Sequence, residues 1–211
     1  MVNTISVTDA LKQHQALFLD TRTPKEFEED HLPNAINLPI LSNEERAIIG
    51  TIYKQVSQDD AINKGIEFFS EKMPEYLQEV SKYKHKLLII YCWRGGMRSR
   101  TITSLLESLG YNVKQMTGGY KSYREYVRQQ LENYQLKSHI IILWGLTCTG
   151  KTDLIKVFPN SLDLEGLAQH RGSLYGSIGL HPNSQKHFEN LFLQKINQLN
   201  TQPTLFVEGE S

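Results

Sequence analysis

Cysteine is scarce in this chain, which has 211 residues and only two cysteines, Cys92 and Cys148. Two cysteines 56 positions apart provide neither a disulfide framework nor a zinc site, and the histidines show no metal-ligand spacing, so no metal site is predicted from them. So low a cysteine content is typical of a reducing compartment, which predicts a cytoplasmic protein. In that setting an exposed cysteine is better explained by catalysis than by structure.

An excess of charge and a long apolar run are also missing. The chain has 23 Lys and Arg against 23 Asp and Glu, which excludes a general attraction to nucleic acid or to an anionic membrane. Any RNA contact therefore needs a local basic patch. No apolar run approaches the length of a bilayer span, and the N-terminus lacks a basic segment followed by an apolar one. We therefore predict no membrane span and no secretory signal.

Apolar strands alternate with helices in the first part of the chain. The apolar run at 86–91 is continuous rather than alternating, which is typical of a strand covered on both faces of a parallel sheet. A helix follows from 97 to 109, and further strands are predicted at 16–20 and 111–116. This order predicts an α/β domain with a parallel sheet over residues 1–125. It also contains a helical insert at about 43–80.

A helix is predicted over residues 120–137, of which 126–137 would link the first domain to a second α/β domain at 138–211. Lys121, Arg124 and Arg128 form a basic face on this helix. That face is either a solvated surface or a contact for RNA phosphates.

Cys92 begins a loop that is rich in glycine and arginine and is followed by a helix. Backbone N–H groups in such a loop form an anion-binding concavity, and the helix adds the positive end of its dipole. Arg94 and Arg98 add formal charge, so the surroundings favour the nucleophilic thiolate. Gly95 and Gly96 allow the backbone to adopt positive φ. An inert cysteine buried at a strand end would need none of these neighbours.

Two chemistries share this local pattern. The spacing of Cys92 and Arg98 fits cysteine-dependent phosphatases, and the same loop serves sulfurtransferases that carry a persulfide. The wider sequence favours the second, because Asp20-x-Arg22, HLPNAINLP at 31–39 and GGY at 118–120 resemble a rhodanese domain over residues 1 to about 125. In that resemblance Asp20, Arg22 and the two loop glycines support the cysteine. Tyr91, which precedes the cysteine, is not the histidine usual in the phosphatases.

The second domain carries the pattern G-x-x-x-x-G-K-[ST] between a predicted strand and a predicted helix, at residues 145–152, here called the phosphate loop. Lys151 reaches terminal phosphates in such loops, and the Thr152 hydroxyl ligates Mg²⁺. An acid after the strand 204–207, Glu208 or Glu210, is predicted in the Walker B position. A P-loop NTPase-like α/β domain is expected, with phosphate-binding residues Gly145, Cys148, Thr149, Gly150, Lys151 and Thr152 and with Mg²⁺ as a candidate ion.

Taken together, the two domains resemble the tRNA 2-selenouridine synthase family. The resemblance covers nearly the whole chain and is carried by Asn43–Arg46, Gly50, Tyr53–Gln55, the cysteine and phosphate loops, Asp163–Ser173 and Glu208–Ser211. It implies a tRNA-modifying transferase that replaces the sulfur of wobble 2-thiouridine with selenium from selenophosphate. It also implies S-geranylation of that sulfur by geranyl diphosphate, and an enzyme that supplies selenophosphate.

The resemblance also implies roles for single residues. Cys92 would carry selenium as a perselenide beside Arg94 and Arg98, the phosphate loop would bind the prenyl diphosphate, and Gly65 would serve the selenium step. The alternatives are a rhodanese-type sulfurtransferase using a Cys92 persulfide, a Cys-x5-Arg phosphatase, and a non-catalytic nucleotide-binding module. The family is longer, and residues 138–211 are few for a complete phosphate-loop domain. The expectation is either a C-terminal partner chain or a C-terminally truncated product, and full activity is not expected of this chain alone.

Overall fold

The computed structural model describes residues 2–146, 149–172 and 175–209. The chain divides into two compact units, residues 1–126 and 127–211. Both units have parallel strands with helices between them, so the predicted α/β class is confirmed. No helix in the described part of the chain combines the length and the apolar character that a membrane span requires.

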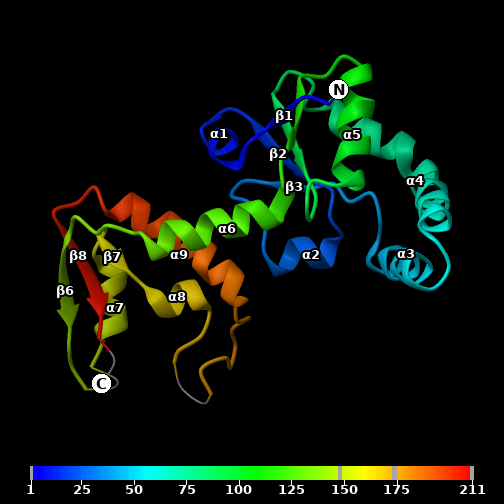
Figure 1. Ribbon diagram of the computed structural model, residues 1–211. Helices are drawn as coiled ribbons and strands as arrows, with labels where there is room; N and C mark the ends of the chain where they lie inside the picture. The colour runs from blue at the N-terminus through cyan, green and yellow to red at the C-terminus, as the bar shows by residue number, and fades with distance from the viewer. Residues whose placement is uncertain (1, 147–148, 173–174, 210–211) are drawn as a thin grey trace. The chain divides into compact units, whose positions relative to one another are not determined.

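The first unit is built on a five-stranded parallel sheet with strand order β1-β5-β4-β2-β3 (Figure 1). The strands are β1 (Thr4–Ile5), β2 (Leu17–Asp20), β3 (Ile36–Asn37), β4 (Leu88–Tyr91) and β5 (Val113–Met116). In the centre, β4 pairs with β2 on one side and with β5 on the other, and all four of its residues are fully buried. The continuous apolar run therefore lies where a parallel sheet is covered on both faces.

The helices of this unit start at side-chain caps. They are α1 (Val7–Leu11), α2 (Pro24–Glu29), α3 (Asn43–Gln55), α4 (Gln58–Ser81) and α5 (Met97–Ser108). Thr23 with Glu26 and Ser42 with Glu45 form capping boxes, which satisfy the first free N–H groups of α2 and α3. Ser57 caps α4, so only two residues separate α3 from α4, and these two helices pack together as the helical insert.

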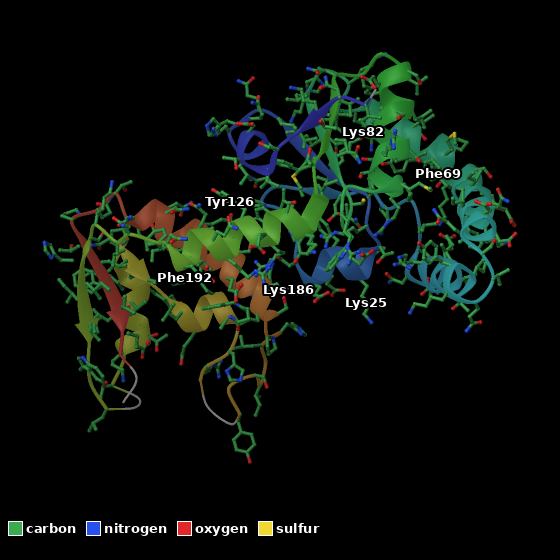
Figure 2. All side chains as sticks on the ribbon, viewed as in Figure 1. Lys25, Phe69, Lys82, Tyr126, Lys186 and Phe192 are labelled. Carbon is green, nitrogen blue, oxygen red and sulfur yellow. The ribbon has the colours of Figure 1, made fainter. Side chains whose placement is uncertain are left out.

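The core of the first unit lies between its sheet and the helices α4 and α5. Leu88 and Ile90 of β4 pack with Phe69 of α4 and Ile102 of α5 (Phe69 is labelled in Figure 2). Because side chains alternate along a strand, Ile89 points to the opposite face. Figure 1 shows α5 and α4 on one side of the sheet and α1 on the other. The sheet is thus covered on both faces, and its carboxyl edge carries the cysteine loop.

The helix α6 (Gly119–Glu132) corrects one expectation about surface charge. Arg124, predicted on an exposed basic face, is only 9% exposed, and its Nη1 lies 3.9 Å from the Asp30 carboxylate. Tyr123 and Val127 are buried, whereas Lys121 is exposed. Arg124 turns inward toward the buried carboxylate of Asp30. The helical periodicity of α6 could not predict this, because Asp30 lies outside that helix.

The second unit has a three-stranded parallel sheet with the order β6-β8-β7. Its strands are β6 (His139–Leu143), β7 (Ser161–Leu162) and β8 (Thr204–Glu208), and its helices are α7 (Lys151–Val157), α8 (Leu164–Ala168) and α9 (Gln185–Leu199). A small core joins Leu162, Leu199 and Leu205, with Phe192 of α9 packed against it (Figure 2). β6 forms an edge of the sheet, and Ile140–Ile142 on it are exposed.

Candidate active site and phosphate loop

Cys92 lies directly after β4, at the foot of the loop that leads into α5. Its side chain is 3% exposed, and Sγ lies 3.2 Å from Oγ of Ser99 in the first turn of α5. Gly95 has φ +64°, and a Cβ there would lie 2.9 Å from the carbonyl oxygen of Met116, so the position requires glycine. Gly96 has φ −89°, so the expected positive φ is wrong at this second glycine.

A second glycine turn closes the cysteine loop from the β5 side. The N–H groups of Tyr120 and Lys121 donate to the carbonyls of Cys92 and Trp93, at 2.8 and 2.9 Å. Gly119 has φ +59°, and a Cβ on it would lie 2.2 Å from the Cys92 carbonyl oxygen. From the sequence, the GGY segment at 118–120 was only part of the resemblance to a rhodanese domain. In the structure it is one wall of the cysteine loop.

Gln115 of β5 also supports this loop, and sequence reasoning missed it. Its Nε2 donates to the carbonyl of Gly95 at 2.8 Å and to Oγ of Ser99 at 2.9 Å. One side chain therefore joins the loop to the serine that contacts Cys92. The available signal is that Gln115 lies two positions after Val113 and so shares a strand face with an apolar residue, where a buried polar side chain requires hydrogen-bond partners.

The two arginines predicted around Cys92 lie in different settings. Arg98 pairs with Glu26 of α2, with Nη1–Oε2 and Nη2–Oε1 distances of 2.9 and 3.5 Å. Burial disfavours the Glu26 carboxylate, but the hydrogen bond and the charge of Arg98 outweigh it and lower the pKa of Glu26. Arg94 is exposed on the loop. The structure thus holds Arg98 in place through an acid on another helix and leaves Arg94 in solvent.

Asp20 and Arg22, predicted as supporting residues, form a buried ion pair beside β4. Nη2 of Arg22 lies 2.6 Å from Oδ2 of Asp20 and 2.7 Å from the Asp30 carbonyl oxygen, and the guanidinium lies 3.9 Å from the ring centroid of Tyr120. Burial works against the charged guanidinium, but the hydrogen bond and the charge of Asp20 prevail and raise the pKa of Arg22. The pair fixes the end of β2 against the tyrosine that follows the glycine turn.

An apolar cavity of about 890 Å³ lies between the helical insert and α5. Gly65 of α4 lines it, together with Phe69 of the same helix and Ile49 of α3. A Cβ on Gly65 would lie 3.5 Å from Cδ1 of Ile49, which is an ordinary contact. Gly65 thus lies in the wall of the cavity on α4, whereas the loop that carries Cys92 follows β4. Sequence reasoning did not predict a cavity here.

The phosphate loop connects β6 with α7 in the second unit. Nζ of Lys151 donates to the carbonyls of Gly145 and Leu146 at 2.7 and 3.0 Å, and Oγ1 of Thr149 donates to the Leu146 carbonyl at 2.8 Å. Gly150 precedes α7 with φ +84°. The predicted residue Cys148 lies outside the described residues. Lys151 therefore folds over its own loop, at the N-terminal end of a helix.

Thr152 and Glu208 come together at the base of the phosphate loop. Oγ1 of Thr152 lies 3.0 Å from Oε2 and 3.3 Å from Oε1 of Glu208, and Nζ of Lys151 lies 4.0 Å from Oε1. Of the two acids predicted for this position, Glu208 is the one seen beside the loop, and Glu210 lies outside the described residues. A hydroxyl and a carboxylate are oxygen ligands, the kind that Mg²⁺ prefers, so these two residues fit that ion.

Comparison with known families divides the chain in the same way as the two units. Residues 6–126 match the rhodanese-like domain family, and residues 138–211 match the family described as tRNA 2-selenouridine synthase AAA domain. The crystal structure of the N-terminal domain of a Clostridium difficile 630 protein is similar to the first unit. It has a TM-score of 0.58 and 44% identity, and the match covers 59% of this chain and 98% of that one.

Curated relatives extend this similarity over both units. The tRNA 2-selenouridine synthase of Nitrosomonas europaea is 38% identical over 204 residues, which are 92% of this chain and 52% of the relative. The enzyme of the same name from Pseudomonas syringae pv. tomato is 35% identical over 195 residues, which are 87% of this chain and 53% of the relative. The chain therefore spans about half the length of the curated relatives that it matches.

Proposed function

The chain belongs to the tRNA 2-selenouridine synthase family, and on this premise we propose that it acts in replacing sulfur with selenium at the wobble 2-thiouridine of tRNA. The observation that carries the proposal is Cys92 in its glycine loop, in contact with Ser99 at the start of α5. The chain spans about half the length of its relatives, so the activity of the whole relative is a proposal for this chain.

In this proposal Cys92 is the nucleophile, and the loop N–H groups with Arg98 and Arg94 favour its thiolate. Its sulfur forms a bond to C2 while the bond from C2 to the geranylated sulfur breaks. The selenium of selenophosphate, which a separate enzyme supplies, then forms a bond to C2 and releases the Cys92 thiolate, and water breaks the Se–P bond to give phosphate, with no change of oxidation state. Sulfur that already carries a geranyl group leaves as geranylthiol, a better leaving group than bare sulfide.

The second unit would prepare that leaving group. The thiouridine sulfur attacks the first carbon of geranyl diphosphate, and diphosphate departs with the electrons of the broken C–O bond. The phosphate loop suits this step because Lys151 and the N-terminus of α7 attract the diphosphate. Mg²⁺ would be held by Thr152 and Glu208 and would offset the charge of the departing group.

Mass spectrometry of wobble nucleosides tests this function. We expect selenouridine and geranylthiouridine in tRNA from cells that have the gene and neither in cells that lack it. Cys92→Ser should remove selenouridine and leave geranylthiouridine, because the sulfur-alkylating step does not use the thiol. Lys151→Ala should lower both products. Nucleosides that do not change when the gene is removed would refute the proposal.

A rhodanese-type sulfurtransferase is the second candidate, favoured by the match of residues 6–126 to the rhodanese-like family. It predicts transfer of sulfur from thiosulfate to cyanide, with a Cys92 persulfide as intermediate. That turnover should vanish in Cys92→Ser and persist in Lys151→Ala. Turnover at the level of a single-domain rhodanese, without any change in tRNA nucleosides, would favour this candidate over selenium transfer.

A further inference from the structure

The cavity between α3, α4 and α5 combines apolar walls with charge of one sign. Its volume of about 890 Å³ lies within the range of small-molecule sites, which is about 300–1,000 Å³. The walls are mainly aliphatic and aromatic, and the charged residues that line it are Arg46, Lys54 and Arg98, all cationic. Among the described residues no carboxylate lines the cavity. Such a site suits an apolar chain that is joined to an anionic group.

The cavity shares a helix with the cysteine loop. Arg98 and Thr101 of α5 line the cavity, and Ser99 between them contacts the Cys92 thiol at 3.2 Å. These residues lie within one turn of helix, since each residue adds about 1.5 Å along the axis. Successive residues turn about 100° around the helix axis, so Ser99 and Thr101 lie on different faces of α5. The cavity and the Cys92 thiol therefore contact the same turn of α5 from different sides.

The cations on α3 are spaced for a nucleotide chain. Arg46 and Lys54 are both exposed, and their eight-residue separation corresponds to about 12 Å along the helix. Two cations this far apart on flexible side chains suit two separate phosphates of an RNA strand better than one compact diphosphate. The cavity also differs from the phosphate loop, where a lysine and a helix N-terminus converge on one point.

We propose that this cavity binds the geranyl chain of the S-geranylated wobble nucleotide, with the adjoining RNA phosphates at Arg46 and Lys54. The inference rests on the proposed function and adds to it the place where the alkylated intermediate is held for selenium transfer. It also gives a reason for glycine at position 65, because a side chain longer than that of alanine at this wall would occupy the space of the geranyl chain.

Calorimetric titration of the 211-residue chain with S-geranyl-2-thiouridine 5′-monophosphate tests the proposal. Gly65→Leu on α4 and Thr101→Phe on α5 add bulk at two residues that line the cavity, and each should weaken binding at least tenfold. Asn63→Leu and Ser104→Phe place the same bulk on exposed positions of the same helices and should leave binding unchanged. The S-methyl analogue should bind wild type at least tenfold more weakly, and Gly65→Leu should not change its affinity.

Three results would overturn the proposal. The first is unchanged affinity for the S-geranyl nucleotide in both cavity variants, with melting curves that show a folded first unit. The second is equal affinity for the S-geranyl and S-methyl nucleotides. The third is loss of geranyl diphosphate binding in Gly65→Leu but not in Lys151→Ala, which would make the cavity the donor site. The assay requires no turnover, so tRNA lacking gene-dependent selenouridine refutes the proposed function and leaves the binding result to decide the cavity.

Discussion

Two strands with similar runs of isoleucine and leucine, β4 and β6, lie in different surroundings. Ile89 and Ile90 of β4 are fully buried in the middle of five strands, whereas Ile140 and Ile142 of β6 are 52% and 49% exposed at the edge of three. Ile141, on the other face of β6, is also exposed. An apolar run therefore predicts that a strand forms, but its burial depends on helices and strands that other parts of the chain must supply.

The largest expected effect on stability is at the buried Asp20–Arg22 ion pair, because water cannot reach the charge that remains when one partner is removed. Asp20→Ala leaves Arg22 buried without its carboxylate, and we expect the free energy of unfolding of the first unit to fall by about 3–5 kcal/mol. The measurement is urea unfolding followed by Trp93 fluorescence in a Trp144→Phe background. Glu67→Ala, which removes the partner of Lys64 at the surface, is the control and should cost about 1 kcal/mol or less. An equal loss in the free energy of unfolding in Asp20→Ala and Glu67→Ala would contradict the expected difference between the buried and the surface ion pair.

The second prediction compares the strands directly. Ile90→Ala removes methylene groups from the core of the first unit, so the free energy of unfolding should fall by about 2–5 kcal/mol. Ile141→Ala in β6 should cost about 1 kcal/mol or less, because solvent already reaches that side chain. Trp93 reports the first unit and Trp144 the second, each in a background that lacks the other tryptophan. A loss in β6 as large as that in β4 would show that Ile141 is covered in solution.

The third prediction concerns pH and the Glu26–Arg98 pair. The pKa of Glu26 is lowered in the folded protein, so its contribution is present above the unfolded pKa and is lost as pH falls through the folded one. The difference in melting temperature between wild type and Glu26→Gln should therefore be largest near neutral pH, and it should disappear below about pH 4. The contribution is about 1 kcal/mol or less, because both side chains are partly exposed. A gap that is independent of pH would mean that the pair has no charge-linked role.

The smallest expected effect on stability is at the exposed strand. Ile141→Lys should change the free energy of unfolding of the second unit by about 0.5 kcal/mol or less, because the side chain ends in solvent. It should reduce binding of a hydrophobic dye, since a lysine on an edge strand interrupts the apolar surface. Dye fluorescence of the variant and wild type at equal concentration measures this. Unchanged dye binding would indicate that the dye does not bind at β6.

Local features of the site could be predicted because they depend on a few neighbouring residues. The run before Cys92 predicts a buried strand, and Gly95 predicts a turn with positive φ, both as found. Gly96, by contrast, has negative φ and open space around it, since Gly95 alone accommodates the close approach to Met116. Glycine in a sequence permits unusual backbone angles, but only the packing around it decides whether they are used.

Partners distant in the chain could not be predicted. Arg98 was expected, with Arg94, to add positive charge beside Cys92, and nothing in the sequence indicated that its guanidinium pairs with Glu26, 72 positions away. Gln115 carries no motif and nevertheless joins Gly95 to Ser99. Arg124 follows a surface periodicity but is drawn to Asp30. Each contact depends on strand order, which places the ends of β2, β4 and β5 side by side.

By itself the sequence determined the α/β class, the cysteine loop and the phosphate-loop pattern, because short-range backbone preferences and hydrophobic periodicity act within one element. Only the tertiary structure decided which apolar strand is buried, which acid approaches Thr152, and that Gly65 lines a cavity beside α5, the helix that follows the cysteine loop. Burial and empty space are properties of how several elements pack, and no single stretch of sequence contains them.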